Sequence, residues 1–231
     1  MLANRLKPIM EDIITPYQNA FSKGRLILDN IIIAHELLHT IKSKKEGRVH
    51  FAALKIDLSK AYDHLSWNFS ELVLQKTGFS QPWINIIMQC ISTVTYSILI
   101  NGAPTVSFRP SQGIRQGDPL SSYLFILCVN ILSCMLLDME GKGLVQGIEL
   151  RKGEIPITRM FFVDSILIFM KINKQTPGRL KDTLESFCKM SGKNINDGKS
   201  TMTVSPNCNV EEREGLQEKF KIQIKAKIGK Y

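Results

Sequence analysis

The sequence has little cysteine and no pattern that would pair its cysteines or bind zinc. Its five cysteines are scattered, without a Cys-x-x-Cys pair and without a histidine at zinc-finger spacing. No stretch reaches the roughly 18 to 20 uninterrupted apolar residues of a membrane span, and the N-terminus lacks the apolar core of a signal peptide. We therefore exclude a disulfide-stapled secreted domain and expect an intracellular protein without a membrane partner.

Internal repeats and low-complexity tracts are missing too, and what remains is a globular composition with excess positive charge. Hydrophobic residues make up 44% of the 231 positions, which is enough for a real core. Lysine and arginine number 30 against 21 aspartates and glutamates, giving a net charge of +9. This excess favours a polyanionic partner such as nucleic acid, although solvated surface lysines would produce the same count.

Hydrophobic periodicity predicts helices and strands in a mixed order. Residues 27–42 carry a helical stripe, and residues 51–58 alternate as a strand with the even-numbered side chains on the apolar face. Further helices are predicted over 65–76, 82–91, 118–138 and 177–190, with a strand pair turning at Asn101-Gly102 and a second pair within 157–170. This order implies an α+β fold in which an antiparallel sheet is backed by helices.

The predicted helix over 118–138 has the clearest start signal. Asp118 and Pro119 are typical of an N-cap and of the first helical position. The apolar residues expected to line its buried side are Leu120, Leu124, Leu127 and Ile131.

Two aspartates stand at the ends of predicted strands. Asp57 closes the strand over 51–58, and Asp164 interrupts the apolar run of 157–170. An ionised carboxylate beside buried strands is costly unless it is paired or holds a metal, and Mg²⁺ would relieve the repulsion between two of them. The alternative from spacing alone is that Asp164 is a turn residue and Asp57 caps the next helix.

Two longer segments carry a resemblance to a known family. Residues 54–63, Leu-Lys-Ile-Asp-Leu-Ser-Lys-Ala-Tyr-Asp, resemble motif A of reverse transcriptases, and residues 113–121, Gly-Ile-Arg-Gln-Gly-Asp-Pro-Leu-Ser, resemble their motif B. Shorter matches extend from Leu6 through Phe21 and Arg25 to Lys199-Ser200, about 200 residues in family order. The pattern is most similar to the reverse transcriptases of plant LINE-like, non-LTR retrotransposons.

The resemblance implies a right-hand polymerase palm with partial fingers, acting as an RNA-directed DNA polymerase. Its partners would be an RNA template, a DNA primer and deoxynucleoside triphosphates, with nuclear localisation, and its cofactor Mg²⁺ or Mn²⁺. The implied roles are metal ligands for Asp57 and Asp164, sugar screening for Tyr62, a phosphate contact for Arg115, packing against the nascent base pair for Gln116 and Gly117, and neutralisation or protonation of pyrophosphate for Lys199. We expect Asp63 and Asp118 to cap helices instead of binding metal.

The sequence departs from the family pattern at its most sensitive point. Where the family has Phe-Ala-Asp-Asp, this chain reads Phe162-Val163-Asp164-Ser165, so one active-site carboxylate is replaced by a hydroxyl. Ser122 stands where proline is usual, and Lys193-Asn194 replaces a usual Leu-Lys or Gln-Lys pair. We expect weakened or absent polymerisation.

The domain organisation follows from the same comparison with the family pattern. We expect an N-terminally shortened fingers-palm domain over 1–209 and a charged segment over 210–231 that begins a missing thumb or connection. A non-catalytic nucleic-acid-binding remnant is the main alternative function. A viral-type RNA-dependent RNA polymerase would share the palm, but Tyr62 and the 116–121 run favour a reverse transcriptase.

Overall fold

The computed structural model describes residues 1–20, 24, 26–151 and 153–225. Phe21 and Arg25 of the family resemblance, and positions 226–231 of the charged segment, lie outside the described residues. The helices are α1 (Leu2–Ile13), α2 (Ile27–Ser43), α3 (Trp67–Lys76), α4 (Gln81–Ser92), α5 (Pro119–Gly141), α6 (Thr176–Ser191) and α7 (Val210–Phe220). The strands are β1 (His50–Ser59), β2 (Leu99–Ile100), β3 (Ala103–Pro104), β4 (Arg159–Phe162), β5 (Ser165–Ile172), β6 (Asn194–Ile195), β7 (Thr201–Val204) and β8 (Gln223–Ile224).

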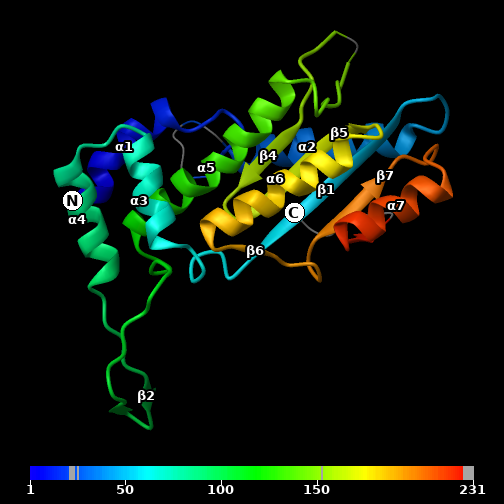
Figure 1. The fold of residues 1–231 in the computed structure, drawn as a ribbon. Coiled ribbons are helices and arrows are strands. Elements are labelled where there is room, and N and C mark those ends of the chain that lie inside the picture. Colours follow the sequence, from blue (N-terminus) through cyan, green and yellow to red (C-terminus); the bar gives the residue numbers. More distant parts are fainter. Residues whose placement is uncertain (21–23, 25, 152, 226–231) are drawn as a thin grey trace.

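A six-stranded sheet organises the molecule around β1 (Figure 1). The strand order is β4-β5-β1-β7-β8, and the short β6 pairs with the end of β1. Every pairing is antiparallel except that of β7 with β8. The predicted α+β fold, an antiparallel sheet backed by helices, is therefore confirmed.

Helices cover both faces of this sheet. The apolar even-numbered side chains of β1, Ala52, Leu54, Ile56 and Leu58, are buried in the main core with residues of α1, α3, α4, α5, α6 and α7. On the opposite face, Ala53 and Leu167 belong to a smaller core cluster formed with α2. The alternation in the sequence predicted the apolar face of β1 correctly, because that face meets the larger helical layer.

Helix α5 runs through the centre of the main core, and its burial differs from the prediction. Leu120, Leu124 and Leu127 are buried as expected, but so are Phe125 and Val129 on other sides of the helix, whereas Ile131 is half-buried. By length and composition this helix could cross a membrane. Its central place among the other helices accounts for the apolar composition, as in the core helix of a soluble protein.

The two predicted hairpins differ in their contacts with the rest of the molecule. The β2–β3 hairpin projects from the body beyond α4 (Figure 1). The sequence predicts a strand pair over 96–100 and 105–108, but the ladder is shorter, with an isolated bridge between Tyr96 and Phe108. The β4–β5 hairpin forms one edge of the six-stranded sheet and turns through only Val163 and Asp164. Val163 takes the left-handed conformation with φ of 52°, which is strained for a β-branched residue.

Candidate active site

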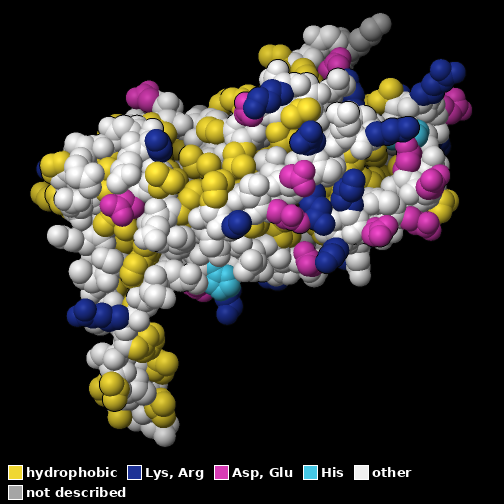
Figure 2. All heavy atoms as spheres, viewed as in Figure 1, with side chains coloured by type: hydrophobic (Ala, Val, Ile, Leu, Met, Phe, Trp, Pro, Cys, Tyr) yellow, Lys and Arg dark blue, Asp and Glu magenta, His cyan; other side chains and the backbone are white. Residues whose placement is uncertain are grey.

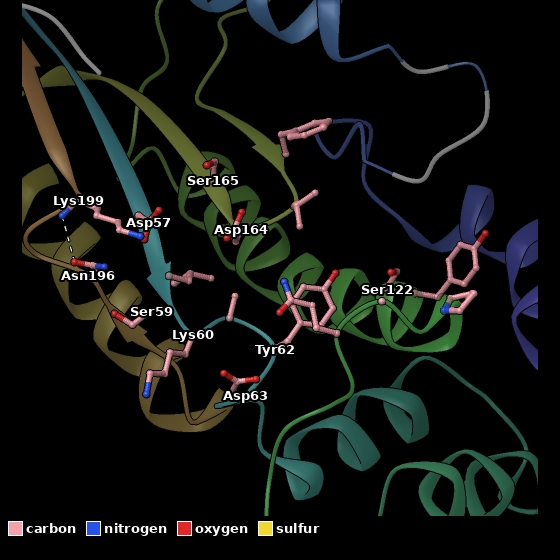
Figure 3. A pocket seen from close by; sticks show the side chains of 18 residues that line it. Asp57, Ser59, Lys60, Tyr62, Asp63, Ser122, Asp164, Ser165, Asn196 and Lys199 are labelled. Atoms are coloured by element: carbon pink, nitrogen blue, oxygen red, sulfur yellow. Dashed lines mark hydrogen bonds between the residues drawn. The ribbon is translucent and has the colours of Figure 1, made fainter. Parts of the chain in front are cut away.

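An open cavity of about 910 Å³ lies where β1 ends and the β4–β5 hairpin turns (Figure 3). Its walls come from four parts of the chain that are distant in sequence: residues 57–63, the start of α5 with the loop before it, the turn at 162–165, and Asn196 with Lys199. The register of the sheet brings these parts together, because the end of β1 pairs with the start of β5 and with β6.

Asp57 and Asp164 meet at one edge of this cavity. Asp57 is paired across the sheet with Ser165, and Asp164 occupies the turn immediately before Ser165. The backbone of Asp57 is fixed on both sides, because its N–H donates to Ser200 Oγ at 3.1 Å and its carbonyl accepts from the Asn196 N–H at 2.8 Å. Among the residues that the structure describes, neither carboxylate makes a hydrogen bond or an ion pair, so their oxygens remain free for a ligand.

Tyr62 forms a side wall of the cavity. Its ring stacks on Phe125 with centroids 4.7 Å apart and an interplanar angle of 13°. Its hydroxyl bonds to Ser122, the residue that replaces the usual proline. Burial raises the pKa of Tyr62, the charge of Asp164 raises it further and the Ser122 bond opposes this, so the hydroxyl is neutral at physiological pH.

Lys193 lies behind this wall, and sequence reasoning missed its role. Its side chain is buried, its ammonium donates to the carbonyl of Ala61, and it lies 4.5 Å from the centre of the Phe125 ring. Burial lowers the pKa of Lys193 to about 8, although nearby thiols and Asp164 favour its charged form. The sequence offered one indication of this role, which is that lysine at position 193 departs from the family pattern.

The loop before α5 packs directly on the segment that carries Tyr62. The Ile114 N–H donates to the Tyr62 carbonyl at 3.0 Å, and the indole of Trp67 donates to the Gly113 carbonyl at 2.6 Å. Gly113 has φ of +88°, and a Cβ there would lie 2.5 Å from the Asp63 carbonyl oxygen. Only glycine fits this close approach, so the two motifs form one rigid unit.

Most of the predicted site residues line this single cavity. They are Asp57, Tyr62, Gln116, Gly117, Asp164, Ser165 and Lys199. Arg115 is the exception, since it lines a neighbouring cavity of about 480 Å³. In Figure 3 the Lys199 side chain is directed toward the Asp57 side of the cavity.

The capping predictions are half correct. Asp118 caps α5, because its Oδ1 accepts from the Leu120 N–H at 2.9 Å. The prediction for Asp63 is wrong: Ser66 caps α3 and Asp63 lines the cavity. The alternative of Asp57 as a helix cap is excluded for the same reason. The cavity also includes Lys60, which no spacing argument singled out and which adds a second cation.

Comparison with known proteins gives the same assignment across nearly the whole chain. Residues 1–223 match the family described as reverse transcriptase (RNA-dependent DNA polymerase). The chain is 29% identical over 202 residues to the Retrovirus-related Pol polyprotein from type-1 retrotransposable element R2 of Popillia japonica, covering 87% of this chain and 27% of that protein. It is 24% identical over 197 residues to the Transposon TX1 uncharacterized 149 kDa protein of Xenopus laevis, covering 85% and 14%. The chain thus spans less than a third of these relatives.

Solved structures with the same fold include two yeast telomerases. The apo telomerase from Candida tropicalis, truncated from its C-terminal domain, superposes with a TM-score of 0.59 at 18% identity, covering 90% of this chain and 41% of that one. The telomerase from Candida albicans gives a TM-score of 0.57 at 14% identity, covering 91% and 35%. The fold, the cavity that gathers both motifs and the match over residues 1–223 together show that the chain belongs to the reverse transcriptase (RNA-dependent DNA polymerase) family.

Proposed function

We propose that this chain is the fingers-palm part of a retrotransposon reverse transcriptase that extends a DNA primer on an RNA template, at a rate reduced by Ser165. The observation that carries the proposal is the meeting of Asp57, Asp164 and Tyr62 around one open cavity. The substrates are deoxynucleoside triphosphates. The similarity to the R2 and TX1 proteins supports a non-LTR element as the source.

A plant LINE-like origin is part of this proposal. It is supported by 44% identity over 66 residues to an uncharacterized mitochondrial protein of Arabidopsis thaliana, covering 29% of this chain and 54% of that protein. We also propose nuclear localisation, because an element of this type copies RNA at chromosomal targets. An RNA template is consistent with the fold shared with a telomerase from Candida tropicalis, which was solved in complex with a fragment of telomeric RNA.

The donor set fits a pair of hard divalent cations. Asp57 and Asp164 offer half-buried carboxylate oxygens that no described partner occupies, and oxygen ligands are those that Mg²⁺ and Mn²⁺ prefer. Such ions, when bound, neutralise charge on the attacking and leaving oxygens of a phosphoryl transfer. Ser165 adds no negative charge where the family has a third carboxylate, so the site binds these ions less firmly.

The chain's own residues act by positioning and by charge. Lys60 and Lys199 line the cavity as cations, and both suit a triphosphate or the departing pyrophosphate. Tyr62 is held against Phe125 and Ser122, and its fixed ring would clash with a 2′-hydroxyl on the incoming sugar. Gly117 presents only backbone to the cavity, which suits close packing against the nascent base pair.

A non-catalytic nucleic-acid-binding remnant is the second candidate function. The net charge of +9 and the loss of a carboxylate at Ser165 both favour it. The two candidates differ in one respect: the remnant binds RNA and DNA but never incorporates nucleotide.

Primer extension on a poly(A)-tailed RNA template, with Mg²⁺ and with Mn²⁺, tests the proposal. We expect Ser165→Asp to raise incorporation about tenfold or more, and Asp57→Ala to abolish it, because a lost metal ligand removes several kcal/mol of charge stabilisation and each ~1.4 kcal/mol is tenfold in rate. Asp182→Ala, an exposed carboxylate on α6, is the matched control and should change nothing.

Two outcomes would overturn the assignment. Activity that survives Asp57→Ala would show that the reaction does not use this site. Folded variants that bind nucleic acid but never incorporate nucleotide, Ser165→Asp included, would favour the remnant.

A further inference from the structure

A second cluster of metal-binding side chains lies at the opposite end of β1 from the active-site cavity. His50 opens β1, whereas Asp57 lies seven positions further along it, about 23 Å away for an extended strand. The Nδ1 or Nε2 of His50, the Sγ of Cys208 and a carboxylate oxygen of Glu212 all lie within 4.8 Å of one another. We propose that these three side chains form a zinc site that fastens α7 to the start of β1.

The donor set is the one that Zn²⁺ takes in proteins. Zinc binds imidazole nitrogen, thiolate sulfur and carboxylate oxygen with four ligands in total, and three protein ligands with a water are a common arrangement. Cys208 is buried, whereas the side chains of His50 and Glu212 remain 17% and 36% exposed. The cluster therefore has two features of a site with a water ligand: a buried thiol and a side open to solvent. The soft thiol also favours zinc over Mg²⁺.

The backbone around the three ligands is already fixed. The side-chain N–H₂ of Asn207 donates to the carbonyls of Gly47 and Val49 at 2.9 and 3.1 Å, which ties the loop before β1 to the loop after β7. Arg213 donates to the carbonyls of Ser205 and Cys208 at 3.2 and 3.1 Å. These bonds fix the loops that carry His50 and Cys208 before a metal binds.

Glu212 is oriented by its place in α7. The Glu212 N–H donates to the side chain of the N-cap Asn209 at 2.7 Å, which makes Glu212 the third residue of the helix. Its carboxylate then reaches His50 Nδ1 at 2.6 Å and Cys208 Sγ at 3.4 Å. Figure 1 shows α7 at the same end of the sheet as the start of β1. Residues far apart in sequence thus converge on one carboxylate.

Metal binding at this cluster displaces protons from the ligand atoms. Without metal, the Cys208 thiol and the His50 Nδ1–H both donate to Glu212. On binding, the thiol releases its proton to solvent, and the imidazole nitrogen of His50 that binds the metal does so without a proton. Burial and then Glu212 raise the pKa of Cys208 to about 11, so the metal-free thiol is protonated and unreactive at neutral pH. Arg213 is the nearby cation that opposes this rise.

Binding of Co²⁺ in place of zinc tests the site directly. A thiolate bound to Co²⁺ absorbs in the near ultraviolet, whereas Co²⁺ bound only by carboxylates, as at Asp57 and Asp164, gives no such band. We expect one equivalent of Co²⁺ to produce this band in the parent chain and in Cys90→Ser, whose cysteine is exposed on α4. The band should vanish in Cys208→Ser, and Zn²⁺ should displace the Co²⁺. His50→Gln and Glu212→Gln should each weaken Co²⁺ binding at least tenfold.

Thermal melting gives an independent readout that does not involve polymerase activity. Saturating Zn²⁺ should raise the Tm of the parent chain and of Cys90→Ser by several degrees, and leave that of Cys208→Ser unchanged. A parent chain without the thiolate band, or a band that survives in Cys208→Ser, would overturn the proposal. If Cys208→Ser does not fold, His50→Gln decides: a folded variant with unchanged Co²⁺ affinity also overturns it.

Discussion

Two residues change the electrostatics around Asp164 in the same direction. Ser165 supplies a neutral hydroxyl where the family pattern has a second aspartate, and Lys193 places an ammonium beneath the cavity where leucine or glutamine is usual. The Lys193 charge interacts with Asp164, so it offsets part of the negative potential that would attract a divalent cation. Restoring the carboxylate at position 165 therefore recovers only part of the lost metal affinity.

Lys193 also costs folding stability, and Lys193→Met should recover some of it. An unfolded lysine has a pKa near 10.4, whereas burial lowers that of Lys193 to about 8, a difference on the order of 3 kcal/mol against the charged form. Losing the bond to Ala61 leaves a buried carbonyl and offsets about 1–2 kcal/mol of this. We expect the methionine variant to be roughly 1–2 kcal/mol more stable at pH 7 in urea unfolding.

The pH dependence of this gain has a defined sign. Below about pH 8 lysine is protonated in both states, so its contribution is constant. Between about pH 8 and 10.4 the unfolded chain binds more protons, and the parent chain regains stability from this residue as pH rises. The advantage of Lys193→Met should therefore shrink by pH 9.5, whereas the exposed control Lys189→Met shows no such trend. A pH-independent difference would contradict a buried ammonium.

At the scale of elements, hydrophobic periodicity predicted the helices and strands whose two sides differ in burial. Helices α2 and α6 have a buried and an exposed side, and much of strand β1 alternates between buried and half-buried residues; their predicted ranges agree with the structure to within two residues. Strand β7 gave no such signal, because all four of its residues are buried and include two threonines. Helix α7 buries only Leu216 and Phe220, which is too few for a clear stripe.

The active-site cavity was also predicted only in part, because the sequence shows where strands end but not how they pair. Two carboxylates at strand ends indicate an edge of a sheet, so the approach of Asp57 to Asp164 could be anticipated. The register that pairs Asp57 with Ser165 is set by packing of whole strands, which spacing does not encode. The cluster of His50, Cys208 and Glu212 forms only when β7 places the C-terminal loop beside β1, so searches for sequence-local zinc motifs miss it.

The projecting β2–β3 hairpin should be dispensable for stability. Figure 2 shows apolar side chains gathered on this projection, where Leu99 is 70% and Val106 is 92% exposed. We expect Leu99→Thr combined with Val106→Thr to leave the Tm within about 1–2 °C of the parent chain, because exposed positions contribute within ~0.5 kcal/mol. Aggregation measured by light scattering should fall, since an exposed apolar edge is removed.

Ile168→Thr on the buried strand β5 gives the contrasting control for the hairpin experiment. Ile168 is fully buried, and we expect this substitution to cost on the order of 3 kcal/mol through lost packing and an unpaired hydroxyl. A double hairpin variant that melted as early as Ile168→Thr would show that the hairpin packs against the body.

At the scale of the whole molecule, the sheet joins two chemically different ends. Strand β1 carries Asp57 to the cavity at one end and His50 to the C-terminal helix at the other. A cation bound by His50, Cys208 and Glu212 would stiffen β1, because it would tie the start of this central strand to α7. Strand β1 thus links the two sites as a rigid element. Because one site has a thiol and an imidazole and the other has only carboxylates, zinc and magnesium are expected to bind at different sites.

The net charge of +9 predicts binding to nucleic acid that depends strongly on salt. For about four phosphate contacts, affinity for an RNA–DNA duplex should fall roughly a hundredfold between 50 and 200 mM salt. If the cavity holds the duplex, Lys60→Gln combined with Lys199→Gln should flatten the slope of log K against log salt by about two. Lys142→Gln, which lies in an exposed ion pair at the far end of α5, should not. A slope that the Lys60→Gln and Lys199→Gln double variant leaves unchanged would place the nucleic acid on another surface. That result would contradict the polymerase proposal, which requires the duplex to lie over Asp57 and Asp164, whereas a non-catalytic remnant could still bind elsewhere.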